Sequence, residues 1–422
     1  MMFYMKKIQL NTISLLFSLL FLFPLIKENL SNIIFITLSV FVIITRILQK
    51  ERVKITLETF YLTIPFWIVL ITSFFSNNWN ESIIHVKHAL IFLMFPLIFS
   101  ILPKENFSLQ KINFYLGVLK NVCLLIAFIY LFSFFYHFPL NKINVVTYNN
   151  SLFRRYIYTD FKLFIIHPAY YTTILILCTA HSLHLVLNKH KYLQMLYVIS
   201  FVLITFLLST KLNVILLIGL IVYMIVKNIN VNKTITSYIG LLVIIISLIF
   251  LFLYTPGIKS RFNEIYTDFN KKPDGMYFNS TNIRKAIFEC DIALIKDNWQ
   301  RGVGFENLQN QLNSCYDSNY DSSFYKLLTY MTHNYYFYIL ISSGIIGFLF
   351  YLFYLFKILE ICLKSNLFLF KVFLLNALII CFVEDYFYRQ HGVFYFNLLL
   401  MCFINHLEYN KQNQIDLPNE PL

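Results

Sequence analysis

Apolar runs of about twenty residues recur along almost the whole chain, and they limit its possible folds more than any other feature. A helix needs about 20 apolar residues to cross the roughly 30 Å hydrocarbon core of a bilayer. Backbone polar groups find no water in lipid, so open sheets cannot span it. The sequence therefore predicts an all-α polytopic membrane protein. We count about twelve spans, near residues 8–26, 32–48, 59–75, 83–102, 112–137, 167–187, 193–209, 212–227, 235–254, 334–357, 367–383 and 391–406.

The charged residues indicate how these spans are oriented. The chain holds 34 Lys and Arg against 21 Asp and Glu, a formal net charge of +13. This charge could suit nucleic acid, but the positive residues form short clusters between apolar runs, as in the cytoplasmic loops of membrane proteins. We therefore expect membrane lipids and no nucleic acid as partners. The alternation predicts an even number of spans with both termini cytoplasmic.

One polar segment, residues 255–332, is long enough to fold by itself. Its apolar residues recur at helical spacing from Ile283 to Leu294, with Ser280 or Thr281 as the expected N-cap. The Gly302–Gly304 turn should end this helix, and a second short helix should follow. The expected organisation is a bundle of nine spans at 1–254, an outer helical loop at 255–332, a bundle of three spans at 333–410 and a cytoplasmic tail at 411–422.

His333 lies where this loop meets the tenth span, and it is the first candidate for chemistry. A histidine at a span end can be an interfacial ring, or a general base that titrates near neutral pH. Asn334 follows it, and after nine intervening residues comes Gly344-Ile345-Ile346-Gly347. Such glycines allow helices to approach closely in lipid and would hold the helix that begins at the histidine.

Two cations on the outer side could bind an anion. Arg284 lies one turn into the first loop helix, where it is either a solvated charge or a clamp on phosphate. Lys211 lies at the tight turn between the seventh and eighth spans, where it could snorkel or serve a functional site.

Further positive or basic residues lie on the same side. Arg154 and Arg155 belong to a second outer loop in which positive residues outnumber the single Asp160, and an anionic ligand would explain charge retained there. Arg389 lies in the short loop before the last span. His167 precedes Pro168 at the start of the sixth span and is weak evidence alone.

Several other chemistries lack their sequence signals. The chain contains no Walker A loop and no HExxH motif, and its seven cysteines show no CxxC spacing. We therefore expect neither a metal nor another cofactor. Positive side chains would have to stabilise an anionic leaving group in place of a metal.

Cys290 and Cys315 are the two cysteines of the outer loop, and each falls on the apolar face of its helix. In an oxidising compartment they could form a disulfide that joins the helix bearing Arg284 to its neighbour. The alternative is two buried thiols in a small core.

These motifs together resemble the O-antigen ligase and polymerase superfamily of bacterial membrane glycosyltransferases. The resemblance rests on the span order, Ile283-Arg284 in the loop, the run Gly302-Val303-Gly304-Phe305-Glu306-Asn307, and His333-Asn334 before Gly344 and Gly347. It implies a GT-C-like bundle in the bacterial inner membrane with a periplasmic active site. The donor would be a glycan on undecaprenyl pyrophosphate, transferred with inversion and without metal or nucleotide.

By the same resemblance, His333 would activate the acceptor hydroxyl and Arg284 would hold the pyrophosphate. Lys211 occupies a place where family members commonly have arginine, so its phosphate contact would be less rigid. Arg154 and Arg155 would add positive charge, and Asn334, Gly344, Gly347, His167 and Arg389 would support the site.

The acceptor is open at this stage. A ligase would deliver polymer to lipid A-core, whereas a polymerase would extend a growing polysaccharide on the carrier; the His-Asn motif favours the ligase. A protein O-glycosylating enzyme is a third option. A polysaccharide flippase or other transporter would be expected to show repeat symmetry and mid-membrane charges, and neither is evident in the sequence.

Overall fold

A computed structural model of the whole chain describes residues 2–50, 56–76, 78–138, 152–164, 166–232, 246–247, 249–255 and 257–413. Within these ranges the chain is almost entirely helical, and β-type pairing is limited to two isolated bridges. The elements are α1 (Met2–Leu19), η1 (Leu20–Leu22), α2 (Glu28–Leu48), α3 (Leu57–Leu62), α4 (Ile64–Phe74), α5 (Trp79–Ile101), η2 (Lys104–Phe107), α6 (Leu109–His137), α8 (Leu152–Arg155), η3 (Tyr156–Asp160), α9 (Pro168–Lys189), α10 (Gln194–Leu207), α11 (Lys211–Asn232), α13 (Ile258–Asp268), α14 (Ser280–Asn298), α15 (Leu308–Asn319), α16 (Phe324–Leu327), α17 (Tyr335–Lys364), α18 (Phe368–Ile380) and α19 (Gln390–Gln412).

The described helices confirm an all-α polytopic membrane protein. Six of them are long and apolar enough to cross a bilayer, namely α2, α5, α6, α9, α17 and the Lys211–Asn228 part of α11. Four shorter apolar segments accompany them, at Gln9–Leu22, Ile64–Phe74, Gln194–Leu207 and Phe368–Ile380. Most of the predicted span 235–254 lies outside the described residues. The predicted span 59–75 is divided at Thr63, because Pro65 at the start of α4 cannot donate a hydrogen bond back into α3.

Helix α19 lies within the bundle rather than against lipid. Its residues from Gly392 to His406 are all buried, although they include polar side chains. Asn397 and Asn405 donate to carbonyls of their own helix, and His406 Nδ1 lies 2.6 Å from the carbonyl of Phe107. Because these groups are satisfied internally, a helix of modest hydropathy can fill the centre of the bundle.

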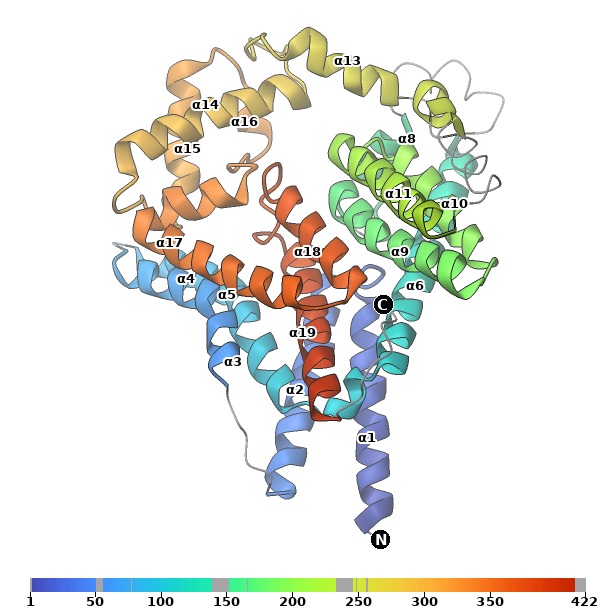
Figure 1. Cartoon of the computed structure of the whole chain (residues 1–422). Coiled ribbons are helices and arrows are strands. Elements are labelled where there is room, and N and C mark those ends of the chain that lie inside the picture. Colours follow the sequence, from blue (N-terminus) through green and yellow to red (C-terminus); the bar gives the residue numbers. More distant parts are fainter. Residues whose placement is uncertain are drawn as a thin grey trace.

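The predicted loop is a folded unit at one end of the molecule. In Figure 1 helices α13–α16 lie together, and the N-terminus lies at the opposite end. We call the end that carries α13–α16 the loop end. Cys290 in α14 and Cys315 in α15 form a disulfide with their Cα atoms 5.9 Å apart. The predicted N-cap of α14 was wrong, because Asn279 has the extended backbone that a cap requires and its side chain accepts from Thr281 and Asn282.

The Gly302–Gly304 turn is inserted into a break in α17. Gly344 has φ +68° and ψ −174°, so the helix is interrupted there and nearby carbonyls lose their helical partners. Val303 and Gly304 donate instead to the carbonyls of Ile341 and Ser342, and the Ile345 N–H donates to the carbonyl of Trp299. The predicted role of Gly344 in close helix packing is therefore replaced by docking of the loop. Gly347, one turn later, does lie against Ile68 of α4.

Candidate active site

Glu384 joins the two residues that sequence analysis placed on separate elements. This carboxylate follows α18, and its Oε1 lies 2.5 Å from Nη2 of Arg284 on α14. Its Oε2 lies 3.4 Å from Nδ1 of His333, which is within ion-pair range but lacks hydrogen-bond alignment. The Glu384 side chain is 10% exposed, whereas that of Arg284 is 44% exposed. The loop thus folds back so that its arginine and the histidine before α17 share one buried carboxylate.

The backbone of His333 is held in an uncommon conformation by the neighbouring acid. Its φ of 46° is in the left-handed region, which costs a residue with a Cβ about 1–3 kcal/mol. The His333 N–H donates to Oδ2 of Asp385 at 2.9 Å, and the Thr332 hydroxyl donates to Oδ1. Asn334 then caps α17 by accepting from Tyr336 and Phe337. Asp385 and Asn334 therefore fix the orientation in which α17 presents the imidazole.

The charges around Glu384 favour its ionised form. Burial by itself would raise the pKa of Glu384, but Arg284, His333 and His167 act against burial, and the net pKa lies below the ordinary glutamate value. The adjacent Asp385 behaves differently, because burial raises its pKa despite its contacts with His333. The two neighbouring carboxyl groups are thus driven apart in pKa, with that of Glu384 lowered and that of Asp385 raised.

His167 and Arg154 are close enough to Glu384 for their charges to interact. His167 Nδ1 accepts from the N–H of Ala169 at 3.2 Å and so caps α9. Burial lowers its pKa to about 4, with Arg154, Arg389 and His333 contributing and Glu384 opposing. Arg154 donates to the carbonyl of Leu208 at 3.0 Å, and burial lowers its pKa to about 10. Glu384 therefore interacts with groups from two further elements, α8 and the N-cap of α9.

Lys211 connects the bundle to the first turn of the loop helix. Its Nζ lies 3.0 Å from Oγ1 of Thr281 on α14 and 3.3 Å from Oε2 of Glu264 on α13. Arg261 shares that carboxylate at 3.8 Å, and burial lowers the pKa of Arg261. Lys211 and Arg284 are close enough for their charges to interact. The structure therefore brings Lys211 to the same cluster, on its α13 side.

Two predicted cations are less involved. Arg155 is exposed, and among the described contacts its carbonyl accepts only from Thr159. Arg389 is also exposed, at the N-cap of α19, and it acts on His167 through its charge. We name the group Arg154, His167, Lys211, Arg261, Arg284, His333 and Glu384 the basic cluster.

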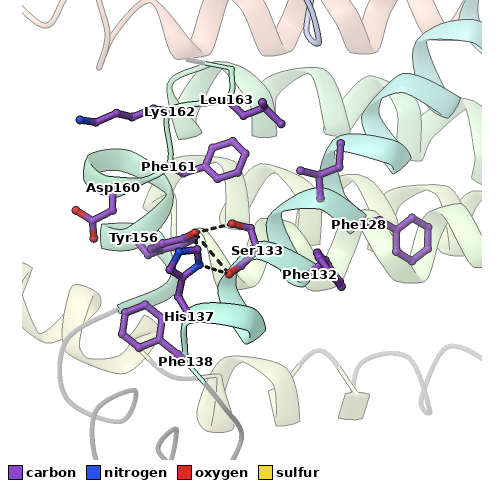
Figure 2. A pocket seen from close by; sticks show the side chains of 11 residues that line it. Phe128, Phe132, Ser133, His137, Phe138, Tyr156, Asp160, Phe161, Lys162 and Leu163 are labelled. Atoms are coloured by element: carbon purple, nitrogen blue, oxygen red, sulfur yellow. Dashed lines mark hydrogen bonds between the residues drawn. The ribbon is translucent and has the colours of Figure 1, made fainter.

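The segment that carries Arg154 is anchored to α6 by a small polar network (Figure 2). The Tyr156 hydroxyl lies 2.5 Å from Oγ of Ser133 and 3.0 Å from Nδ1 of His137. A pocket of about 760 Å³ lies beside this network, and aromatic side chains from α6 and from residues 156–163 line it. Because Tyr156 and Arg154 are two residues apart, the network limits the movement of Arg154.

Sequence analysis did not identify Glu384, Asp385, Arg261 or Glu264. The Glu384-Asp385 pair lies between two apolar spans, where an acid is expensive unless it is paired. That position was a usable signal for a functional group. Arg261 and Glu264 lie in an ordinary charged loop segment, and nothing in their local sequence separates them from solvated charges.

Comparison with protein families identifies the segment that carries most of this cluster. Residues 195–352 match the model of the O-antigen ligase family. This match spans 158 of the 422 residues and supports the O-antigen ligase superfamily. The matched range runs from α10 into α17 and includes Lys211, Arg284 and His333. No curated protein matches the chain. The match to this family supports a membrane glycosyltransferase of the O-antigen ligase or polymerase type.

Proposed function

We propose that the protein is an O-antigen ligase-type glycosyltransferase. It transfers a polysaccharide from undecaprenyl pyrophosphate to an acceptor hydroxyl on the periplasmic face of the bacterial inner membrane, with lipid A-core as the acceptor. The observation that carries this proposal is the Glu384 bridge, which brings a guanidinium suited to phosphate and an imidazole suited to proton transfer to one carboxylate.

His333 is the proposed general base. Its Nδ1 faces Glu384, which leaves Nε2 for the acceptor hydroxyl. A carboxylate behind an imidazole orients the ring and stabilises the imidazolium that forms. The acceptor oxygen attacks the anomeric carbon opposite the leaving group, so the configuration at that carbon is inverted. General-base assistance of this kind contributes about 10²–10⁴-fold to a rate.

Arg284 is the proposed donor contact, with Lys211 and Arg154 beside it. Pyrophosphate leaves as an anion, and preorganised cations stabilise the charge that develops on it. Arg154 and Lys211 are tied to the Leu208 carbonyl and to Glu264, so their positions are set before a donor arrives. Among the residues that the structure describes, Arg155 makes no comparable contact, and it is a weaker candidate.

The acceptor distinguishes ligase from polymerase, and deletion of the protein in its host tests this. In a ligase mutant, gel analysis of lipopolysaccharide loses the whole O-antigen ladder while polymer accumulates on the carrier. A core bearing one repeat unit would instead identify a polymerase. Cytoplasmic lipid-linked repeats with unchanged polymer chemistry would identify a flippase and contradict the proposal.

Substitution of the two central residues tests the mechanism. His333→Ala removes the base and Arg284→Ala the donor contact, so each is expected to reduce transfer at least about 100-fold while the protein still inserts. Complementation of the deletion strain, with protein in membranes measured by immunoblot, provides the readout. Lys285→Ala, next to Arg284 but paired with Glu289, is the matched control and should transfer normally. Near-normal transfer by either site variant would refute its assigned role.

A further inference from the structure

We propose that Glu384 is a positioning residue that exchanges partners when the donor binds. In the structure its two oxygens face Arg284 and His333. The donor pyrophosphate then takes Arg284, and Glu384 is left with His333 alone. This inference rests on the proposed function, and it adds a coupling between donor binding and the base that neither residue provides by itself.

The two ends of the Arg284–Glu384 pair differ in their freedom to move. Glu384 is nearly enclosed at the loop end, whereas Arg284 is 44% exposed on α14. A guanidinium can leave one carboxylate for a phosphate with little rearrangement, because both anions accept the same bidentate geometry. Glu384 has no such alternative, since its second oxygen already faces His333. The arginine is therefore the partner that moves.

The exchange changes the charge that faces His333. While Arg284 is paired with Glu384, its positive charge offsets the negative charge of the carboxylate. The carboxylate then stabilises a protonated His333 imidazole less strongly. The other charged or titratable groups around this pair are Arg154 on α8, His167 before α9, Tyr170 in α9, Lys211 at the start of α11, Arg261 on α13, and Asp385 and Arg389 between α18 and α19. These groups keep their positions in the proposed exchange, in which only Arg284 changes its partner. Loss of Arg284 to the donor thus leaves Glu384 free to stabilise the imidazolium.

The acceptor oxygen bonds to the anomeric carbon while the bond from that carbon to the pyrophosphate oxygen breaks, and its electron pair stays on the pyrophosphate. The hydroxyl proton moves to Nε2 of His333, and Glu384 offsets the new positive charge. When the carrier pyrophosphate leaves, Arg284 returns to Glu384 and the imidazole gives its proton to water. Each donor thereby strengthens the base only while it is bound.

Binding of inorganic pyrophosphate to the full-length protein in nanodiscs tests the exchange. Glu384→Gln removes the anion that competes for Arg284, so pyrophosphate should bind about tenfold more tightly, which corresponds to about 1.4 kcal/mol. Transfer by the same variant should fall, because the imidazolium loses its counter-charge. Glu289→Gln is the control. Glu289 is an exposed acid on α14, the helix that carries Arg284, and its substitution should change neither pyrophosphate binding nor transfer. Unchanged or weaker pyrophosphate binding by Glu384→Gln would overturn the proposal.

A double-mutant cycle separates exchange from simple loss of negative charge. In an Arg284→Ala background, Glu384→Gln should no longer improve pyrophosphate binding, because the contested guanidinium is gone. If Glu384→Gln still tightened pyrophosphate binding in the Arg284→Ala background, the effect would come from the lost negative charge alone and would contradict the exchange. If Arg284→Ala leaves pyrophosphate binding unaltered, the donor role of Arg284 fails independently of Glu384.

Histidine ionisation supplies a readout that a purely structural role would not move. NMR of ¹⁵N-histidine-labelled protein, with the His333 signal assigned through His333→Asn, should show its pKa rising when pyrophosphate is added. The rise should be smaller in Glu384→Gln and be largely restored in Glu384→Asp, which keeps the charge. Equal rises in all three proteins would mean that pyrophosphate acts on His333 directly, and the positioning role would be rejected.

Discussion

His167 shows how a single residue of the site is constrained by its surroundings. Its Nδ1 must stay unprotonated to cap α9, and burial keeps it so by lowering its pKa to about 4. The residue is therefore a neutral structural acceptor within the basic cluster rather than a further cation. Sequence analysis found the position but not this role, because burial depends on the elements packed around it.

The His167 pKa predicts an acid-sensitive contribution to stability. The unfolded chain takes up this proton near pH 6.5, whereas the folded chain does so only near pH 4. Stability is therefore lost as the pH falls from 6.5 to 4, by up to about 1.4 kcal/mol per pH unit. His167→Asn keeps a capping side chain without the titration. Thermal melting at pH 7 and pH 5 should show a smaller loss for His167→Asn than for the unaltered protein, and equal losses would contradict the assignment.

At the scale of elements, the disulfide determines how α14 presents Arg284. Cys290 is fully buried on α14, and its bond to Cys315 joins that helix to α15 across a separation of 25 residues. Closing a loop of this length stabilises a fold by about 3–4 kcal/mol in the chain-entropy description. The α14–α15 pair would otherwise rely on a small apolar core and on the cap at Asn279.

Replacement of one cysteine should therefore loosen the loop. Cys315→Ser is expected to speed proteolysis of residues 257–332 and to reduce transfer severalfold while the bundle still inserts. Thiol alkylation with and without reductant checks the bond itself, and free thiols in both samples would show that it does not form. Cys362→Ser, a buried free cysteine in α17, is the matched control and should leave loop proteolysis unaltered.

At the scale of the whole molecule, the loop and the bundle are joined at the break in α17. A Cβ on Gly302 would lie 2.5 Å from the carbonyl oxygen of Ser342, and a Cβ on Gly344 would lie 2.5 Å from that of Gln300. Both glycines also have positive φ. The insertion of this turn, together with the Glu384 bridge, holds the loop end over the spans in the arrangement that Figure 1 shows.

This junction predicts that Gly302→Ala separates loop from bundle. The added methyl group strains a left-handed residue and displaces a turn that makes two backbone hydrogen bonds, a combined cost of about 2–4 kcal/mol. Transfer should fall, and a protease should cut the loop sooner. Gly117→Ala in α6, where a Cβ would meet nothing within 4 Å, is the control. Equal behaviour of the two variants would show that the turn does not need glycine.

The helical membrane class and most helix positions could be predicted from the sequence alone, which also indicated His333 and Arg284 as candidate site residues. Apolar runs, helical spacing and turn residues are local properties, and each can be recognised within about twenty residues. It did not determine Glu384 as their common partner or Gly344 as a docking site. Arg284 and Glu384 are 100 residues apart, so their contact exists only after the loop has folded onto the bundle. The chain's local pattern thus supplied the chemical groups, while long-range packing decided which of them meet.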